Sequence, residues 1–238
     1  MKVWLPVIVV MGWLCGASAY AQIDEPDIKS DCQKAGIYGQ AGNVAYQQQD
    51  YFKARDLFRD QVAWSEFCHL SKSVIATAYN NIALAYIHQG MYRKANAWLM
   101  LAPDDKKSEF NRHQIQQQLD ALPVSPSPVG EYWQYAGLGS WNIVEVKSVG
   151  KQFEVEYSGL SMGVSSLYYG PATGSFSAIT TIKDGKAVYH QTGDIIDGEQ
   201  HCTVHMSFSG DSLAMRTIGD CGFGRNVRAE GTYIRVES

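Results

Sequence analysis

Pro123-Val-Ser-Pro-Ser-Pro-Val-Gly130 separates two parts of the chain that differ sharply in composition. Its prolines predict a short, stiff linker at residues 123–130. Residues 28–122 are rich in Ala, Gln, Leu, Lys and Arg, which favour helices. Residues 131–238 are rich in Gly, Ser, Thr, Tyr and Val, which are typical of strands and tight turns. The sequence therefore predicts an α+β protein of two domains, with helical hairpins followed by an antiparallel β barrel or sandwich.

The second part contains short segments in which apolar and polar residues alternate. Residues 152–157 show the period of a half-buried strand, and Asp184-Gly185 is a strong hairpin signal. About nine strands are expected between residues 131 and 238, one of them at Ser166 to Tyr169. Cys202 shares an inward face with its apolar neighbours. Cys221 would tie the glycine-rich stretch 219–225 to the barrel.

The segment Asn81-Ile-Ala-Leu-Ala-Tyr-Ile-His-Gln-Gly-Met-Tyr-Arg-Lys-Ala95 dominates the first part. Its small residues allow two antiparallel helices to approach closely, and its glycine supports a turn between them. This pattern resembles a tetratricopeptide repeat (TPR), and the resemblance covers about residues 35–103. The matching positions are Ala83, Tyr86, Gly90, Tyr92, Ala95, Leu99 and Ala102.

A weaker copy of the repeat runs from Gly42 to Phe58, with Gln49 in place of the turn glycine. A third helical stretch, 108–122, would place Phe110, Ile115 and Leu119 on one face. It has the character of the polar cap that terminal repeats need.

Four cysteines remain once Cys15 is removed with the leader, and four cysteines permit three pairings. In the hairpin that the TPR resemblance implies, Cys32 and Cys68 lie at similar distances from the turn near Gln49. Both helices rise by the same distance per residue, so in an antiparallel pair the two cysteines lie side by side at the end opposite the turn. This predicts a disulfide between them.

The beginning of the chain has the features of a cleavable signal peptide at residues 1–21. Lys2 precedes the apolar run Val3 to Cys15, and an A-x-A pattern predicts cleavage after Ala21. No later stretch is apolar over the length of a membrane-spanning helix. The expected location is therefore the periplasm or the exterior, where disulfides form. A net charge of −4 disfavours a nucleic-acid partner.

The TPR resemblance implies binding, because stacked helical hairpins expose a concave surface to a partner. Asn43 and Asn81 fall at positions where TPR domains hold a peptide backbone, and a general peptide-contacting role is expected for these two residues and for Asn80 and His88. Gly39 stands where a carboxylate-binding lysine would be expected. The alternative is that these four residues are simply solvated.

Catalytic and metal-binding patterns are weak. Gly210-Asp211-Ser212-Leu213 matches an esterase motif, but no histidine follows it. His201 and His205 would lie about 13 Å apart along a strand, too far to share a metal ion. The acidic group Asp194, Asp197 and Glu199 is more typical of a polar turn. No catalytic residue, metal or cofactor is therefore predicted.

The leading hypothesis is an exported, non-enzymatic interaction protein, such as an adaptor, inhibitor or immunity-type binder, whose partner is a protein or peptide of the cell envelope. A first alternative is a barrel that binds a small apolar or lipid ligand, with the aromatic residues Tyr132 to Tyr135 and Trp141 either at its mouth or in its core. A second alternative is a hydrolase with an unidentified site.

Overall fold

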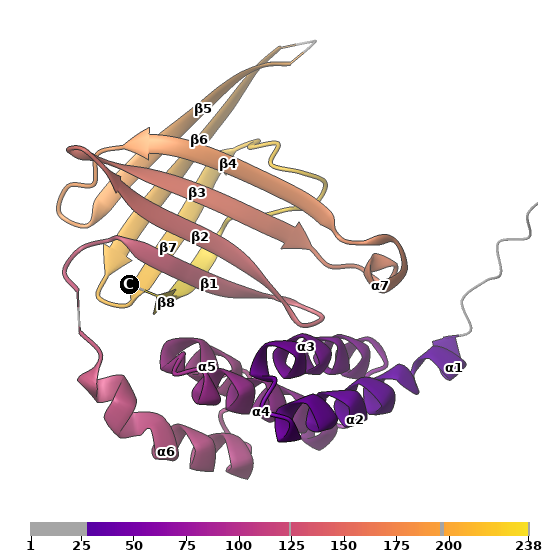
Figure 1. Cartoon of the computed structure of the whole chain (residues 1–238). Coiled ribbons are helices and arrows are strands. Elements are labelled where there is room, and N and C mark those ends of the chain that lie inside the picture. The colour runs from indigo at the N-terminus through magenta and orange to yellow at the C-terminus, as the bar shows by residue number, and fades with distance from the viewer. Residues whose placement is uncertain (1–27, 124, 196–197, 238) are drawn as a thin grey trace, which may run out of the picture.

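The computed structural model describes residues 28–123, 125–195 and 198–237. The expected signal peptide and its cleavage site lie outside the described residues. A group of helices comes first and an antiparallel, nearly closed β barrel follows, as Figure 1 shows. The expected α+β fold is confirmed, and a barrel rather than a sandwich forms. In the described part of the chain, no helix has the length and apolar character needed to cross a membrane.

The helices form what is called the arm below. They are α1 (Ile28–Asp31), α2 (Lys34–Gln47), α3 (Tyr51–Phe67), α4 (Lys72–His88), α5 (Tyr92–Leu99) and α6 (Lys106–Ala121). The side chain of Asp50 caps α3 and that of Asp105 caps α6, each accepting hydrogen bonds from main-chain N–H groups. Gln49 takes a φ of 61° between α2 and α3, where a turn glycine was missing from the sequence.

The pair α2 and α3 is held together by close packing and by a covalent bond. A Cβ atom on Gly42 would lie 2.5 Å from the Phe58 ring, so only glycine lets α2 lie this near α3. Cys32 and Cys68 form a disulfide at the end opposite the turn, with Cα atoms 5.7 Å apart. The pairing expected from the hairpin is confirmed.

The barrel is a meander in which the first and last strands pair. Its strands are β1 (Gly130–Gly137), β2 (Ser140–Val149), β3 (Gln152–Ser161), β4 (Ala172–Thr180), β5 (Lys186–Ile195), β6 (Gly198–Ser209), β7 (Ser212–Gly219) and β8 (Gly231–Glu237). The order β4-β3-β2-β1-β8-β7-β6-β5 leaves β4 and β5 at the two free edges. Cys202 on β6 is bonded to Cys221, as expected.

The expected strand at Ser166 to Tyr169 is wrong, because this segment forms the short helix α7 (Ser166–Tyr169). The Ser166 hydroxyl accepts a hydrogen bond from the main-chain N–H of Gly163 at 2.7 Å, which fixes the turn into the helix. Gly170 ends it with a φ of 85°. The described residues therefore contain eight strands rather than nine.

The barrel packs on α3, α4 and α5 through aromatic side chains on the outside of β1 and β2. Trp133 contacts Tyr86, while Tyr135 and Trp141 contact Trp98, with ring centroids 5.2 to 6.2 Å apart. Tyr132 alone of the expected aromatic cluster points into the barrel core. The expectation of a barrel mouth or barrel core for the whole cluster is therefore wrong for these three residues, because they lie on the outer side of β1 and β2 and pack into the core of the arm.

A carboxylate lies at the centre of this interface. Glu66 of α3 accepts hydrogen bonds from the hydroxyls of Tyr79 (2.6 Å) and Tyr135 and from the main-chain N–H of Leu138 (2.6 Å). Burial, reinforced by the Glu66 charge, raises the pKa of both tyrosines, so both hydroxyls remain donors. The β1–β2 turn is thereby fixed to α3.

Candidate partner-binding face

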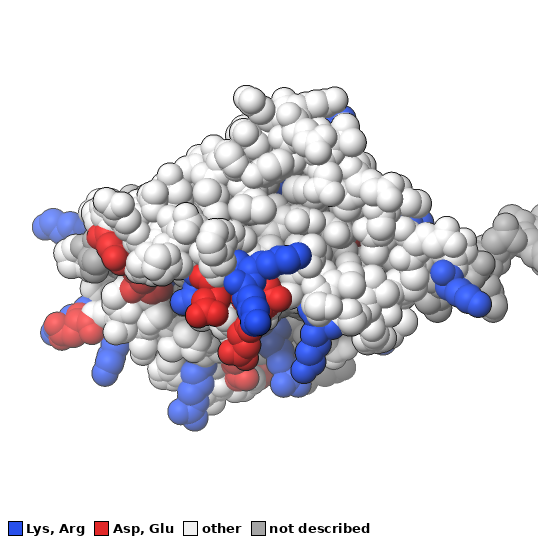
Figure 2. All heavy atoms as spheres, turned by 90° about the horizontal axis from the view of Figure 1, so that it is seen from below, with Lys and Arg blue, Asp and Glu red and all other residues white. Residues whose placement is uncertain are grey.

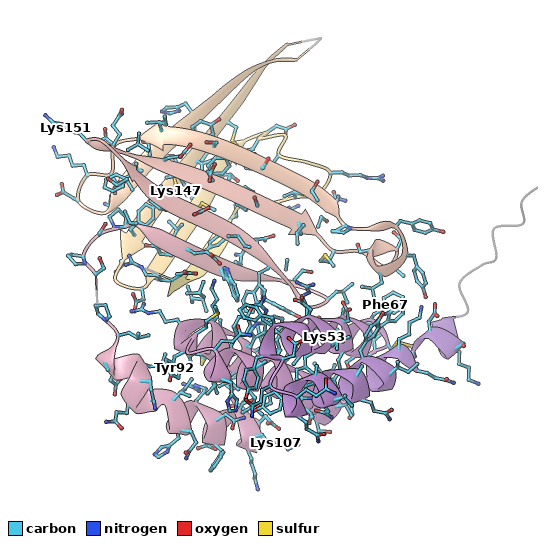
Figure 3. All side chains as sticks on the ribbon, in the orientation of Figure 1. Lys53, Phe67, Tyr92, Lys107, Lys147 and Lys151 are labelled. Atoms are coloured by element: carbon cyan, nitrogen blue, oxygen red, sulfur yellow. A yellow bond between two sulfur atoms is a disulfide. The ribbon has the colours of Figure 1, made fainter. Side chains whose placement is uncertain are left out.

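The barrel covers one side of the arm and leaves the other open. Contacts to the barrel come from α3, from α5 and from Tyr79 and Tyr86 of α4. Asn81 lies about 200° around α4 from Tyr79, so it faces away from the barrel. The exposed side of α2, α4 and α6 is called the outer face below. Figure 3 shows Lys107 of α6 pointing from this face away from the barrel.

A hollow of about 400 Å³ lies on the outer face between α4 and α6. Two of the four residues predicted to contact a peptide, Asn80 and Asn81, line it together with Leu84 and Phe110. The other lining residues are Thr77, Lys106, Lys107 and Asn111. The hollow thus combines apolar side chains, amide groups and two lysines, a mixture that suits a peptide segment.

Asn80 is a structural residue at the bottom of this hollow. It is buried, and its amide nitrogen donates to the Ala76 carbonyl and to the Ser108 hydroxyl, both at 2.8 Å. Its amide oxygen accepts from the Asn111 side chain at 2.7 Å. These bonds join α4 to the beginning of α6, so Asn80 shapes the hollow more than it offers free hydrogen-bonding groups.

Asn81, Asn43 and His88 are more accessible. Asn81 donates to the Gln61 side chain at 3.0 Å, and Gln61 in turn lies against Gly39 of α2. Asn43 is exposed on α2. His88 is exposed at the end of α4, and its ring stacks on Tyr51 with centroids 4.7 Å apart. The four predicted residues therefore do not form one cluster: Asn80 and Asn81 meet in the hollow, whereas His88 is engaged near the α2–α3 turn.

Gly39 of α2 borders the Gln61 side chain, which accepts the hydrogen bond from Asn81. A Cβ atom at this position would lie 2.7 Å from the Gln61 amide nitrogen, so a larger residue here would require the end of Gln61 to shift.

Sequence reasoning missed the exposed apolar residues of the outer face. Ile37 and Val44 of α2, Val74 of α4 and Phe110 of α6 all expose large side chains. Phe110, Ile115 and Leu119 were expected on one face of the last helix, but Phe110 is 61% exposed while Ile115 is buried. The spacing of five residues between them places the two side chains about 140° apart, and that angle was the available signal.

Charges on the outer face are mixed in sign. Figure 2 views the molecule from this side and shows lysines and arginines interspersed with carboxylates, with wide areas of uncharged surface between them. Such a surface lacks the continuous basic stripe that a phosphate backbone requires.

The residues of the esterase-like motif have structural partners. The Ser212 hydroxyl donates to the Ser209 carbonyl at 2.9 Å in the β6–β7 turn. The Asp211 carboxylate lies 2.8 Å from Arg93 of α5. Of the acidic group noted in the sequence, Asp197 lies outside the described residues. Among the side chains that the structure describes, no cluster of His, Cys, Asp and Glu is arranged to hold a metal ion.

The arm and barrel were also compared with known proteins. No family model matches the chain, and the searches of curated proteins and of solved structures found no match either.

Proposed function

We propose that this chain is an exported interaction protein that binds a partner protein or peptide through the outer face of a TPR-like arm. The observation that carries the proposal is the hollow between α4 and α6, which stays open while the barrel occupies the opposite side of the arm. In this role the chain acts as an adaptor or as an inhibitor of the immunity type, with the barrel fixing the arm's orientation.

The composition of the hollow defines the kind of partner. Leu84 and Phe110 offer apolar contact for one side chain, and Asn81 offers an amide near the rim for a peptide main chain. Lys106 and Lys107 at the beginning of α6 favour a segment that carries a carboxylate. A flexible peptide segment satisfies these conditions better than a flat protein surface.

The proposed location is the periplasm or the exterior, reached through a signal peptide cleaved after Ala21. The two disulfides support it, since such bonds persist mainly outside the cytoplasm. Mass spectrometry of the exported protein tests the cleavage, with Gln22 expected as the first residue. A mature chain that still contains Cys15 would contradict it.

Site-specific photo-crosslinking in envelope extract tests the binding face. A photoreactive residue at Phe110 is expected to give one dominant adduct, whereas the same residue at Ile179 on β4 gives none. The two positions are matched, at 61% and 60% exposure. Asn81→Ala should weaken the Phe110 adduct. The same adducts from both positions, or no adduct from Phe110, would contradict the proposal.

A further inference from the structure

The connection between β7 and β8, residues 220–230, fills one end of the barrel and is called the mouth loop below. Its side chains of Phe223, Val227 and Ala229 are buried in the barrel core. The Phe223 ring packs on Phe176 and Tyr157, with centroids 5.1 and 5.7 Å apart. The apolar interior at this end is thus completed by a loop rather than by strands.

The mouth loop is held mainly by side chains of the barrel wall. The Tyr157 hydroxyl donates to the Arg228 carbonyl and the Tyr233 hydroxyl to the Ala229 carbonyl, both at 2.9 Å. Gln134 donates to the Glu230 carbonyl at 3.0 Å. Within the described part of the chain, no backbone-to-backbone hydrogen bond joins residues 220–230 to a strand. The loop can therefore leave the barrel without breaking a β ladder.

Glycines flank the mouth loop, and a hollow lies beside it. Gly219 and Gly231 are the last paired residues before and after the loop, and their φ values of 89° and 130° are accessible to glycine. A hollow of about 530 Å³ lies beside the loop and is lined by the loop itself and Thr217. The Cys202–Cys221 disulfide fixes the first part of the loop to β6. Any opening must therefore move residues 222–230, which lie between Cys221 and the beginning of β8 at Gly231.

The barrel wall is incomplete next to the mouth loop. The edges of β4 and β5 do not pair, and the stacked rings of Phe176 and Tyr189 face each other across the gap, 5.1 Å apart. Gly174 of β4 lies directly against the Phe223 carbonyl, where a Cβ atom would lie 2.0 Å away. The loop thus covers the part of the lumen that the strands leave open.

We propose that the mouth loop is a displaceable plug, and that the lumen beneath it binds an apolar chain that ends in a carbonyl or carboxylate oxygen. Once the loop leaves, Phe176, Tyr157 and Tyr189 form the walls for the apolar chain. The hydroxyls of Tyr157 and Tyr233 lose their loop carbonyls and become two neighbouring donors for the ligand's oxygen. Burial raises the pKa of Tyr157 to about 12, so its hydroxyl remains a donor at neutral pH.

This site lies in the barrel and is independent of the binding face proposed for the arm. The linker crosses the opposite end of the barrel, where the buried Arg235 side chain donates to the Ser127 carbonyl at 2.7 Å and to the Tyr132 hydroxyl at 2.6 Å. Entry there would break these bonds, so the proposal places entry at the mouth loop, with the ligand's oxygen at the mouth-loop end.

Binding of the fluorescent fatty acid cis-parinaric acid to the oxidised mature chain tests the proposal. In the parent protein the probe must compete with the plug, so its apparent affinity is reduced by the small fraction of open loop. Phe223→Ala with Val227→Ala should raise the affinity roughly tenfold or more. The matched control is Ile218→Ala, which trims an exposed side chain on β7 next to the loop and should change nothing.

A second pair of measurements separates a binding site from a loosened core. Adding Tyr157→Phe to the plug variant should weaken parinaric acid binding about tenfold but leave the apolar probe N-phenylnaphthylamine unaffected, because only the acid uses the hydroxyl. In the parent protein, parinaric acid should speed trypsin cleavage at Arg225 and Arg228. If the plug variant is folded and binds no more acid than Ile218→Ala, the lumen is a packed core and the proposal fails. If the plug variant does not fold, unchanged cleavage of the parent protein overturns the proposal.

Discussion

Replacing Glu66 by glutamine tests how much this carboxylate contributes to the interface between the arm and the barrel. The substitution keeps the size of the side chain and leaves one oxygen for the hydroxyls of Tyr79 and Tyr135. The new amide nitrogen then faces the N–H of Leu138, which now lies 2.6 Å from a carboxylate oxygen. Two donors would meet, and the Leu138 bond would be lost.

The expected loss in the free energy of unfolding follows from the three hydrogen bonds that Glu66 accepts. A bond to a charged group contributes about 1.5–3 kcal/mol, so losing the Leu138 bond and weakening two tyrosine bonds sums to roughly 3–4 kcal/mol. Glu66 is only half-buried, and solvent screening reduces the expected loss to about 2–3 kcal/mol. The contact between barrel and arm should weaken most, because the Leu138 and Tyr135 bonds cross between them, whereas the Tyr79 bond joins α4 to α3 within the arm.

Urea unfolding followed by tryptophan fluorescence measures this loss, since Trp98, Trp133 and Trp141 lie in the interface. The control is Glu145→Gln on the exposed side of β2, where the ion pair with Lys147 is screened by solvent and its loss should leave the midpoint nearly unchanged. Equal midpoints for Glu66→Gln and Glu145→Gln would refute the reasoning. So would a double-mutant cycle with Tyr135→Phe that shows no coupling.

Three further predictions concern single features of the fold. Removing the Cys32–Cys68 disulfide, which spans 36 residues, should lower the free energy of unfolding by about 3–4 kcal/mol on the loop-entropy model, and urea unfolding of the double alanine variant measures it. Gln49→Gly should raise the melting temperature and the stability by about 0.5–1 kcal/mol because φ is 61°, whereas Gln49→Ala should not. Gly139→Ala should cost more than Gly150→Ala by about 1–2 kcal/mol in chemical unfolding. Both glycines have positive φ, but only at Gly139 would a Cβ atom press on the Arg59 carbonyl, at 2.8 Å.

Local patterns in the sequence predicted much of the fold. The proline-rich stretch marks the boundary between helices and strands, and counting residues from one turn is enough to pair Cys32 with Cys68. Strand alternation identifies which residues share a face. It does not identify what covers that face, and so the outward aromatics of β1 and β2 were expected in the barrel rather than against the arm.

The errors have physical causes. Ser166 to Tyr169 is too short for periodicity to separate a strand from a single helical turn. The peptide contact of Asn80 stays a prediction, but the sequence did not indicate that Ser108 and Asn111 form hydrogen bonds with its side chain. Those partners lie about 30 residues away along the chain, and no local pattern reveals such distant pairs. The hydrogen bond from Leu138 to Glu66 was missed for the same reason, because it joins residues 72 positions apart along the chain.

The pairing of β1 with β8 sets an order of events during folding. The helices need only neighbouring segments, whereas the sheet can close only after β8 has been synthesised and has reached β1. Val236 of β8 and Trp133 of β1 then cover the arm's apolar side together. A chain truncated before residue 231 would lack Val236 and would leave the edge of β1 that pairs with β8 open. Such an unpaired edge favours aggregation and recognition by chaperones and proteases.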